Sequence, residues 1–376
     1  MIVYLSLTVV VVMLSLLVRK RQTEYGPQMV VYKGMTRQQM VNRICILSIF
    51  VLLFAVSAMR LNVGNDYLKY VEYMHLALYH AYIPTEVGFN VLAYVLYTIC
   101  GFENYLLVFA VYSFATIYFF MKALYDESEW FTFSFILFMM LGYYFQSLST
   151  VRYYLALSMA LYSIKFVIKK DWPKFFLIVL IGSLFHKSML VVLVLYIVAS
   201  LNWKRWMYIA LGLLSISCLF FSDLYLKIVV FLYPSYKDTE YLTGGTSYVN
   251  ILRCLAVLGL SLWLYQDVVK KSRRNRFYFI CNLMALMLYV FGSFLPVISR
   301  IGYYLTITHV LFLPTLVMGI KDYKKKQLAV LAIAVCSLAY FALYMRGAAA
   351  DGVRILPYQT FLFHDLPLTL SERGYY

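Results

Sequence analysis

Four arginines stand at or near the ends of long apolar runs: Arg60, Arg152, Arg253 and Arg300. Arginine keeps its charge and offers a planar fork of donors that suits phosphate oxygens. A charged side chain in or beside a membrane helix costs free energy, so such a residue is a candidate for function. We expect the four to bind one anionic ligand such as a pyrophosphate. The alternative is that each extends to lipid headgroups or pairs with an acid.

Three side chains in the same regions can accept a proton: Asp66, Glu86 and His186. A carboxylate or an imidazole beside a hydroxyl can act as a general base. The alternatives are anchoring salt bridges for the acids and a structural hydrogen bond for the histidine. His75 and His80 do not share a helix face and no HExxH occurs, so no metal site is expected. Walker A, GxGxxG and Gly-x-Ser-x-Gly motifs are missing from the sequence too, and no cofactor is expected.

The composition is that of an integral membrane protein. Of the 376 residues, 63% are apolar and only 13% are charged, against about 25% charged in a soluble domain. The formal charge of +16 fits the cytoplasmic loops of such a protein better than a nucleic-acid partner. The six cysteines stand singly in apolar runs and predict packing residues rather than disulfides or metal ligands.

Apolar runs and basic loops predict one polytopic all-α domain over residues 1–376, with about twelve transmembrane crossings and both termini outside. Ten crossings are expected at residues 2–18, 44–59, 104–121, 130–147, 151–168, 206–222, 248–266, 277–295, 301–320 and 328–345. The basic loops between them, including residues 165–174, 204–205 and 270–276, are assigned to the cytoplasm. Residues 223–247 are expected as an outer loop and residues 346–376 as an ordered outer tail.

Two further regions are expected not to cross as single straight helices. The outer loop of residues 60–103 contains a helix over residues 66–82 whose tyrosines share a face, as in a helix lying in the interface. Residues 87–101 are expected as an interfacial or re-entrant helix. Residues 175–201 predict a hairpin of two short helices with His186 near its tip.

Several short motifs of the chain, taken in order, resemble those of the EpsG family of Wzy-type polysaccharide polymerases. They are Arg60-Leu-Asn-Val-Gly-Asn-Asp66-Tyr67 with Tyr70, Glu86-Val-Gly-Phe89 with Leu92, Val151-Arg152-Tyr-Tyr-Leu-Ala156, Phe185-His186-Lys187-Ser188-Met189-Leu190, and Arg300-Ile-Gly302-Tyr303-Tyr304 followed by Pro314. Tyr153 stands where the family pattern more often has glutamine. The resemblance covers most of the chain.

The resemblance implies a GT-C-like membrane glycosyltransferase that polymerises polyprenyl-diphosphate-linked oligosaccharide repeat units. Its place would be the bacterial cytoplasmic (inner) membrane, with the active site facing the periplasm or the cell exterior. Donor and acceptor would both be linked to a lipid such as undecaprenyl diphosphate, and the product would be capsule, exopolysaccharide or O-antigen. A chain-length regulator is a candidate partner, and nucleic acid is not.

The resemblance also implies a role for each candidate residue. Arg152 and Arg300 would hold the donor diphosphate, with assistance from Arg60 and Arg253. Asp66, Glu86 or His186 would position or deprotonate the acceptor. Four tyrosines are expected to contact sugars, unless they belong to the aromatic belt of the membrane interface: Tyr67, Tyr70, Tyr303 and Tyr304.

Two other functions remain open. A lipid-linked oligosaccharide flippase would share the helices and the anionic lipid substrate, but it should show internal repeats with helix breaks in matching halves. No convincing repeat is found. A membrane O-acyltransferase would use His186 in an apolar setting and would need access to an acyl donor.

Overall fold

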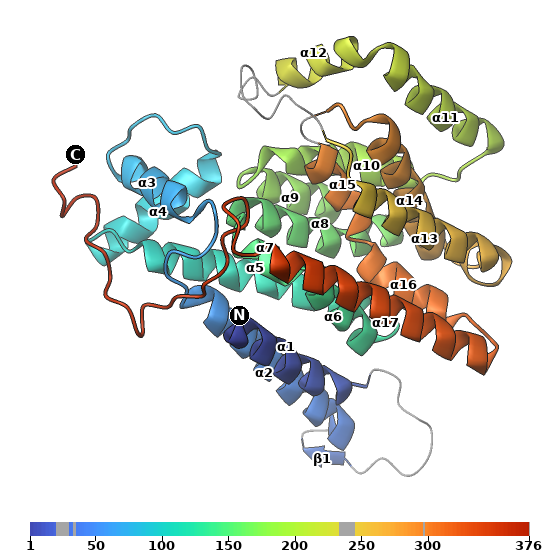
Figure 1. Cartoon of the computed structure of the whole chain (residues 1–376), viewed down its shortest axis with the longest axis horizontal. Helices are drawn as coiled ribbons and strands as arrows, with labels where there is room; N and C mark the ends of the chain where they lie inside the picture. The colour runs from blue at the N-terminus through green and yellow to red at the C-terminus, as the bar shows by residue number, and fades with distance from the viewer. Residues whose placement is uncertain (20–29, 33–34, 233–244, 296–297, 376) are drawn as a thin grey trace. The chain divides into compact units, whose positions relative to one another are not determined.

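The computed structural model describes residues 1–19, 30–32, 35–232, 245–295 and 298–375. In this part of the chain the fold is helical, apart from one short antiparallel pair of strands, β1 (Val30–Tyr32) and β2 (Met35–Thr36) (Figure 1). The chain divides into two compact units. The first comprises Met1–Tyr162, Leu180–Lys187 and Tyr323–Tyr376, and the second comprises Ser163–Val179 and Ser188–Asp322.

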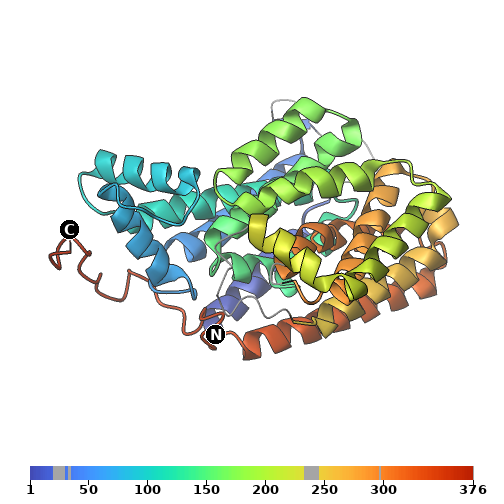
Figure 2. The same ribbon diagram turned by 90° about the horizontal axis from the view of Figure 1, so that it is seen from above.

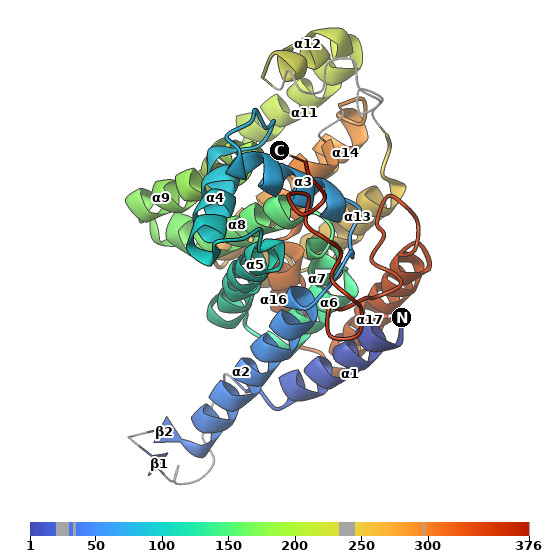
Figure 3. The same ribbon diagram turned by 90° about the vertical axis from the view of Figure 1, so that its left-hand side faces the viewer.

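The first unit holds the N-terminal helices and the last helix of the chain. Its elements are α1 (Ile2–Leu16), α2 (Arg37–Ala58), α3 (Tyr67–Leu78), α4 (Val87–Cys100), α5 (Tyr105–Glu127), α6 (Phe131–Met140), α7 (Tyr143–Ser147), the first part of α8 (Val151–Lys169), and α17 (Tyr323–Arg346). Helix α2 packs between α1 and α5, and α1 lies along α2 in Figures 1 and 3. Thr36 and Gln39 form a capping box that fixes the start of α2.

The second unit is organised around α14. It holds most of α9 (Trp172–Ser183) and of the 3₁₀ helix η1 (Lys187–Leu190), then α10 (Val191–Ser200), α11 (Arg205–Phe220), α12 (Ser222–Leu232), α13 (Tyr248–Trp263), the π-helix η4 (Tyr265–Val269), α14 (Arg273–Phe291), α15 (Ile298–Thr306) and α16 (His309–Met318). Asn282 of α14 donates to the carbonyl of Cys254 on α13 at 3.1 Å, and its amide oxygen lies 2.8 Å from Nε2 of His309 on α16. One buried amide therefore ties three helices together.

Several helices are long and apolar enough to cross a membrane. Five qualify in the described residues, namely α2, α5, α8, the stretch Ile298–Met318 and α17, and the bent pair α11 and α12 would make a sixth. Six shorter apolar helices of 10–17 residues accompany them. The all-α membrane class is therefore confirmed, whereas twelve crossings and a GT-C-like arrangement stay predictions.

Two of the segments expected from the sequence differ in detail in the structure, and two others contain the expected short helices. The stretch of residues 130–147 is not one helix, because Gly142 adopts a left-handed backbone (φ +78°) between α6 and α7. The segment of residues 223–247 begins with α12, and its residues 233–244 lie outside the described part. The segment of residues 175–201 has two short helices with His186 between them. In the outer loop, α3 buries Tyr67 and Tyr70 on one face.

Candidate functional site

Glu86 and Arg152 form an ion pair inside the first unit. Glu86 directly precedes α4, and Arg152 is the second residue of α8. Nη1 of Arg152 donates to Oε2 of Glu86, and the two side chains are only 15% and 13% exposed. With little water around them, charge and hydrogen bonding hold such a pair strongly. Two of the residues singled out in the sequence therefore meet at one place.

The second carboxylate oxygen of Glu86 binds the tip of the 175–201 hairpin. Its Oε1 accepts a hydrogen bond from the backbone N–H of Lys187 at 3.0 Å. Two residues after Glu86, the N–H of Gly88 donates to the carbonyl of Leu184 at 2.8 Å. A Cβ atom on Gly88 would lie 2.6 Å from that carbonyl oxygen, so only glycine allows this approach. The Glu86-Val-Gly88 motif thus docks the tip of the hairpin.

His186 lies at the same junction. It precedes Lys187 in the chain, and its ring meets the ring of Tyr153 edge to face with centroids 5.3 Å apart. Tyr153 follows Arg152 on α8. The structure therefore brings three separated motifs together: the one at Glu86, the one at Arg152 and the one at His186.

Aromatic rings surround the guanidinium of Arg152. Its central carbon lies 5.3 Å from the ring centroid of Tyr70 and 5.4 Å from that of Phe89, which are cation–π distances. The hydroxyl of Tyr70 lies 3.5 Å from Oδ2 of Asp66, at the limit of a hydrogen bond. Among the described residues the buried Nε of Arg152 has no hydrogen-bond partner. One donor of Arg152 is thus left for a ligand.

Arg60 has a different setting from the one expected at the outer end of a helix. Its side chain is fully buried, and its Nη1 binds the hydroxyls of Ser57 and Ser113 at 3.1 and 3.2 Å. Its guanidinium lies 4.9 Å from the ring centroid of Phe109, on which Tyr67 also stacks. Within the described residues Arg60 makes no ion pair, and its Nε and Nη2 have no partner. Burial lowers the pKa of Arg60 from its ordinary value.

The C-terminal tail packs onto the loop that follows Arg60, a contact that the sequence did not suggest. Arg60 and Thr360 form an isolated antiparallel bridge, and the N–H of Gly64 donates to the carbonyl of Arg354 at 2.8 Å. The hydroxyl of Tyr358 donates to a backbone carbonyl of α2 at 3.0 Å. The sequence predicted an ordered tail over residues 346–376 but gave it no role.

A cleft of about 710 Å³ lies between α3 and this tail, which run side by side in Figure 2. His75 lines it, and its Nδ1 lies 2.5 Å from Oε1 of the buried Glu103. The hydroxyl of Ser371 donates to the same oxygen of Glu103. Sequence reasoning compared His75 only with His80. No spacing rule links it to Glu103, which lies 28 residues further along.

The remaining predicted site residues belong to the second unit. Arg253 of α13 donates through Nη2 to Oδ1 of Asn250 at 2.9 Å. Arg300 and Tyr303 are half-buried on α15, whereas Tyr304 is buried with its hydroxyl 2.9 Å from that of Ser188. In the same motif, a Cβ on Gly302 would overlap the hydroxyl of Tyr289, so any other residue there would have to displace the Tyr289 ring.

In the described part of the chain no group of three or more His, Cys, Asp or Glu side chains could hold a metal ion. The model of the EpsG family, a family of Wzy-like polysaccharide polymerase-type proteins, matches residues 43–360. No curated protein and no solved structure matches the chain. The matched range includes every predicted site residue, and it ends at the residue that bridges to Arg60.

Proposed function

Because the chain belongs to the EpsG family, we propose that it polymerises polyprenyl-diphosphate-linked oligosaccharide repeat units at the outer face of the bacterial cytoplasmic membrane. The protein would be an integral membrane glycosyltransferase. The observation that supports this most is the junction at Glu86, where the carboxylate contacts both Arg152 and the backbone of Lys187. A partly buried, charged junction between these motifs is where a polar substrate would be bound in an otherwise apolar protein.

Arg152 is the proposed ligand of the donor diphosphate. A diphosphate carries more charge than the carboxylate of Glu86 and accepts a bidentate pair from guanidinium equally well. It would therefore compete with Glu86 for Arg152, whose Nε has no hydrogen-bond partner among the described residues. Arg253 and Arg300 are also proposed ligands of the lipid diphosphate. Arg60 would act indirectly, by holding the loop that carries Asp66.

Glu86 is the proposed general base. Once the diphosphate occupies Arg152, the carboxylate is released to accept the proton of an acceptor hydroxyl. The acceptor oxygen forms the new bond to the anomeric carbon of the growing chain, and the bond from that carbon to the diphosphate oxygen breaks. The lipid diphosphate leaves with the electron pair, and arginines stabilise its charge. Asp66 and His186 are the alternative bases.

Reconstitution tests the proposal directly. The purified protein in liposomes, supplied with a lipid-linked repeat unit as the sole substrate, should produce a ladder of longer lipid-linked chains and release polyprenyl diphosphate. Folded protein that makes no ladder with a repeat unit from its own cell would refute the polymerase. Movement of the unit across the bilayer without elongation would identify a flippase. Loss of acyl groups with normal polymer length in a deletion strain would identify an acyltransferase.

A further inference from the structure

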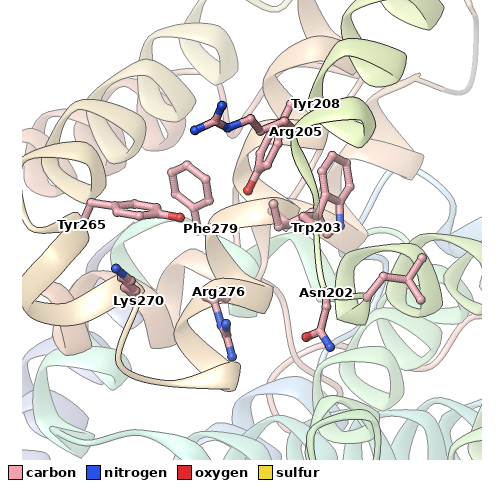
Figure 4. A pocket seen from close by; sticks show the side chains of 10 residues that line it. Asn202, Trp203, Arg205, Tyr208, Tyr265, Lys270, Arg276 and Phe279 are labelled. Carbon is pink, nitrogen blue, oxygen red and sulfur yellow. The ribbon is translucent and has the colours of Figure 1, made fainter.

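The second unit contains a basic pocket whose lining includes none of the candidate site residues discussed above. It has a volume of about 670 Å³ and lies between the start of α11, the end of η4 and the start of α14 (Figure 4). Arg205, Lys270 and Arg276 line it, one from each of these segments. The sequence assigns the basic loops of residues 204–205 and 270–276 to the cytoplasmic side. By that topology the pocket opens away from the face proposed for polymerisation.

The positive charge of the pocket is not neutralised by protein in the described residues. Arg205, Lys270 and Arg276 take part in no ion pair there. The acids of the same region are engaged by other lysines. Asp267 lies 2.9 Å from Nζ of Lys321, which holds the pKa of that carboxyl below its usual value.

Asp171 is engaged in the same way. It accepts from Nζ of Lys174 at 2.7 Å, and this contact lowers its pKa. A smaller pocket of about 310 Å³ shares Leu201 and Asn202 with the first and adds Lys170 and Arg273 to the cationic lining. Five cations thus surround one short loop, whereas the acids nearest in sequence bind other lysines. An excess of this kind creates a positive potential that attracts anions from outside the protein.

Aromatic rings form much of the pocket wall. Trp203 and Tyr208 pack with centroids 5.0 Å apart, and Tyr265 packs edge to face on Phe279 at 5.6 Å. Figure 4 shows these rings among the three cationic side chains. Rings with polar tips next to cations are typical of a site at the boundary of the hydrocarbon region, where one end of a ligand is apolar and the other is charged.

The protein surface beside the pocket carries exposed apolar side chains. Trp206 and Ile209, on the turn of α11 that carries Arg205 and Tyr208, are both 63% exposed. Trp263, at the end of α13 just before Tyr265, is 56% exposed. Side chains of this kind face acyl chains in a membrane-spanning helix. A ligand with a charged head and two hydrocarbon tails would therefore fit both parts of the surface.

We propose that this pocket binds the headgroup phosphate of an anionic phospholipid, with Arg205, Lys270 and Arg276 around the phosphate and the acyl chains along α11 and α13. The lipid would be a bound component of the membrane protein and not a substrate of the polymerase. This inference does not depend on the proposed function. It rests on the pocket, the uncompensated charge and the adjoining apolar surface.

Native mass spectrometry of the full-length protein tests the site. The protein is released from nanodiscs containing equal amounts of phosphatidylglycerol and phosphatidylcholine, and the bound lipids are counted. The wild type should retain phosphatidylglycerol preferentially. A triple variant carrying Arg205→Gln, Lys270→Gln and Arg276→Gln should bind it about tenfold less well or worse. The matched control is Lys324→Gln, Lys325→Gln and Lys326→Gln, which removes the same charge from the start of α17 and should behave as wild type.

Two outcomes would overturn the inference. Equal loss of lipid in the pocket variant and in the control would mean that general surface charge attracts the lipid and that the pocket is not a site. Complete release of phosphatidylglycerol by millimolar inorganic phosphate would mean that the ligand is a soluble phosphate compound. Circular dichroism of each variant excludes misfolding as the cause of a loss.

Discussion

The carboxylate of Glu86 pairs with the guanidinium of Arg152 across 66 positions of sequence, on side chains that are 13% and 15% exposed. The same carboxylate accepts a hydrogen bond from the backbone of Lys187. The Glu86 carboxylate therefore has two roles to distinguish: one oxygen holds the tip of the hairpin, and in the proposed reaction the other exchanges Arg152 for contact with substrate.

Replacement of Arg152 by lysine should reduce polymerisation by about 100-fold, because lysine keeps the charge but loses the planar fork. The fold should survive, since the lysine ammonium can still pair with Glu86. Repeat-unit ladders from reconstituted protein measure the rate, and thermal melting in detergent measures the fold. Arg152→Ala should abolish long polymer in cells while single repeat units accumulate. A full ladder from either variant at normal expression would contradict a role in diphosphate binding.

Replacement of Glu86 by glutamine should lower the polymerisation rate by about 100-fold or more, because an amide cannot take the proton of the acceptor hydroxyl. Glutamine can still accept the hydrogen bond from Lys187, so the hairpin should stay docked. Asp66→Asn and His186→Gln are the matched controls, and each should reduce the polymerisation rate less than Glu86→Gln does. If His186→Gln or Asp66→Asn instead caused the largest loss, the base would be that residue and Glu86 would be structural.

Gly88→Ala should destabilise the protein by about 1–3 kcal/mol, because the added methyl group collides with the carbonyl of Leu184. Gly259→Ala is the control, since a Cβ atom there meets nothing within 4 Å and alanine favours the helix. Thermal melting of the two variants in the same detergent gives the comparison. An equal melting temperature for Gly88→Ala and wild type would mean that the hairpin does not dock as described.

Arg300→Ala should abolish long polymer while single repeat units accumulate, and Arg253→Ala should have a smaller effect. Arg253 already donates to Asn250, so part of its hydrogen-bonding capacity serves the protein. Polymer from a deletion strain complemented with each variant is compared on a gel, with expression measured by an epitope tag. Wild-type polymer length in the Arg300→Ala strain would exclude a direct role for that motif.

Arg60→Gln should retain most of the activity, with a loss below about tenfold and well under that of Arg152→Gln. The buried arginine has no acid partner in the described residues, and glutamine can still bind the hydroxyls of Ser57 and Ser113. Removing an unpaired buried charge should also leave the melting temperature unchanged or raised. Loss of activity as severe as in Arg152→Gln, with normal melting, would indicate that the substrate reaches Arg60.

Local patterns in the sequence predicted the helices of the outer loop and the break at His186, because apolar periodicity and short apolar length determine both. They also identified Arg152 and Glu86 separately. A salt bridge was one of the alternatives for each residue, but the sequence did not predict that these two pair with each other, because pairing depends on how α4, α8 and the hairpin pack. The contact between His75 and Glu103 was missed for the same reason. The glycine of the Glu86-Val-Gly88 motif was recognised as a pattern, but its cause, the close carbonyl of Leu184, is a property of the folded chain.

The bridge between Arg60 and Thr360 also constrains the timing of assembly. At about 5–20 residues per second, the ribosome needs about 15 to 60 s to make the chain that separates these two residues. During that interval the loop after Arg60 has already left the ribosome but lacks the tail residues that contact it. A nascent chain can therefore insert its early helices while the loop that carries Asp66 is incomplete. The contacts that the tail makes with this loop can form only after Thr360 has been synthesised and has left the ribosome.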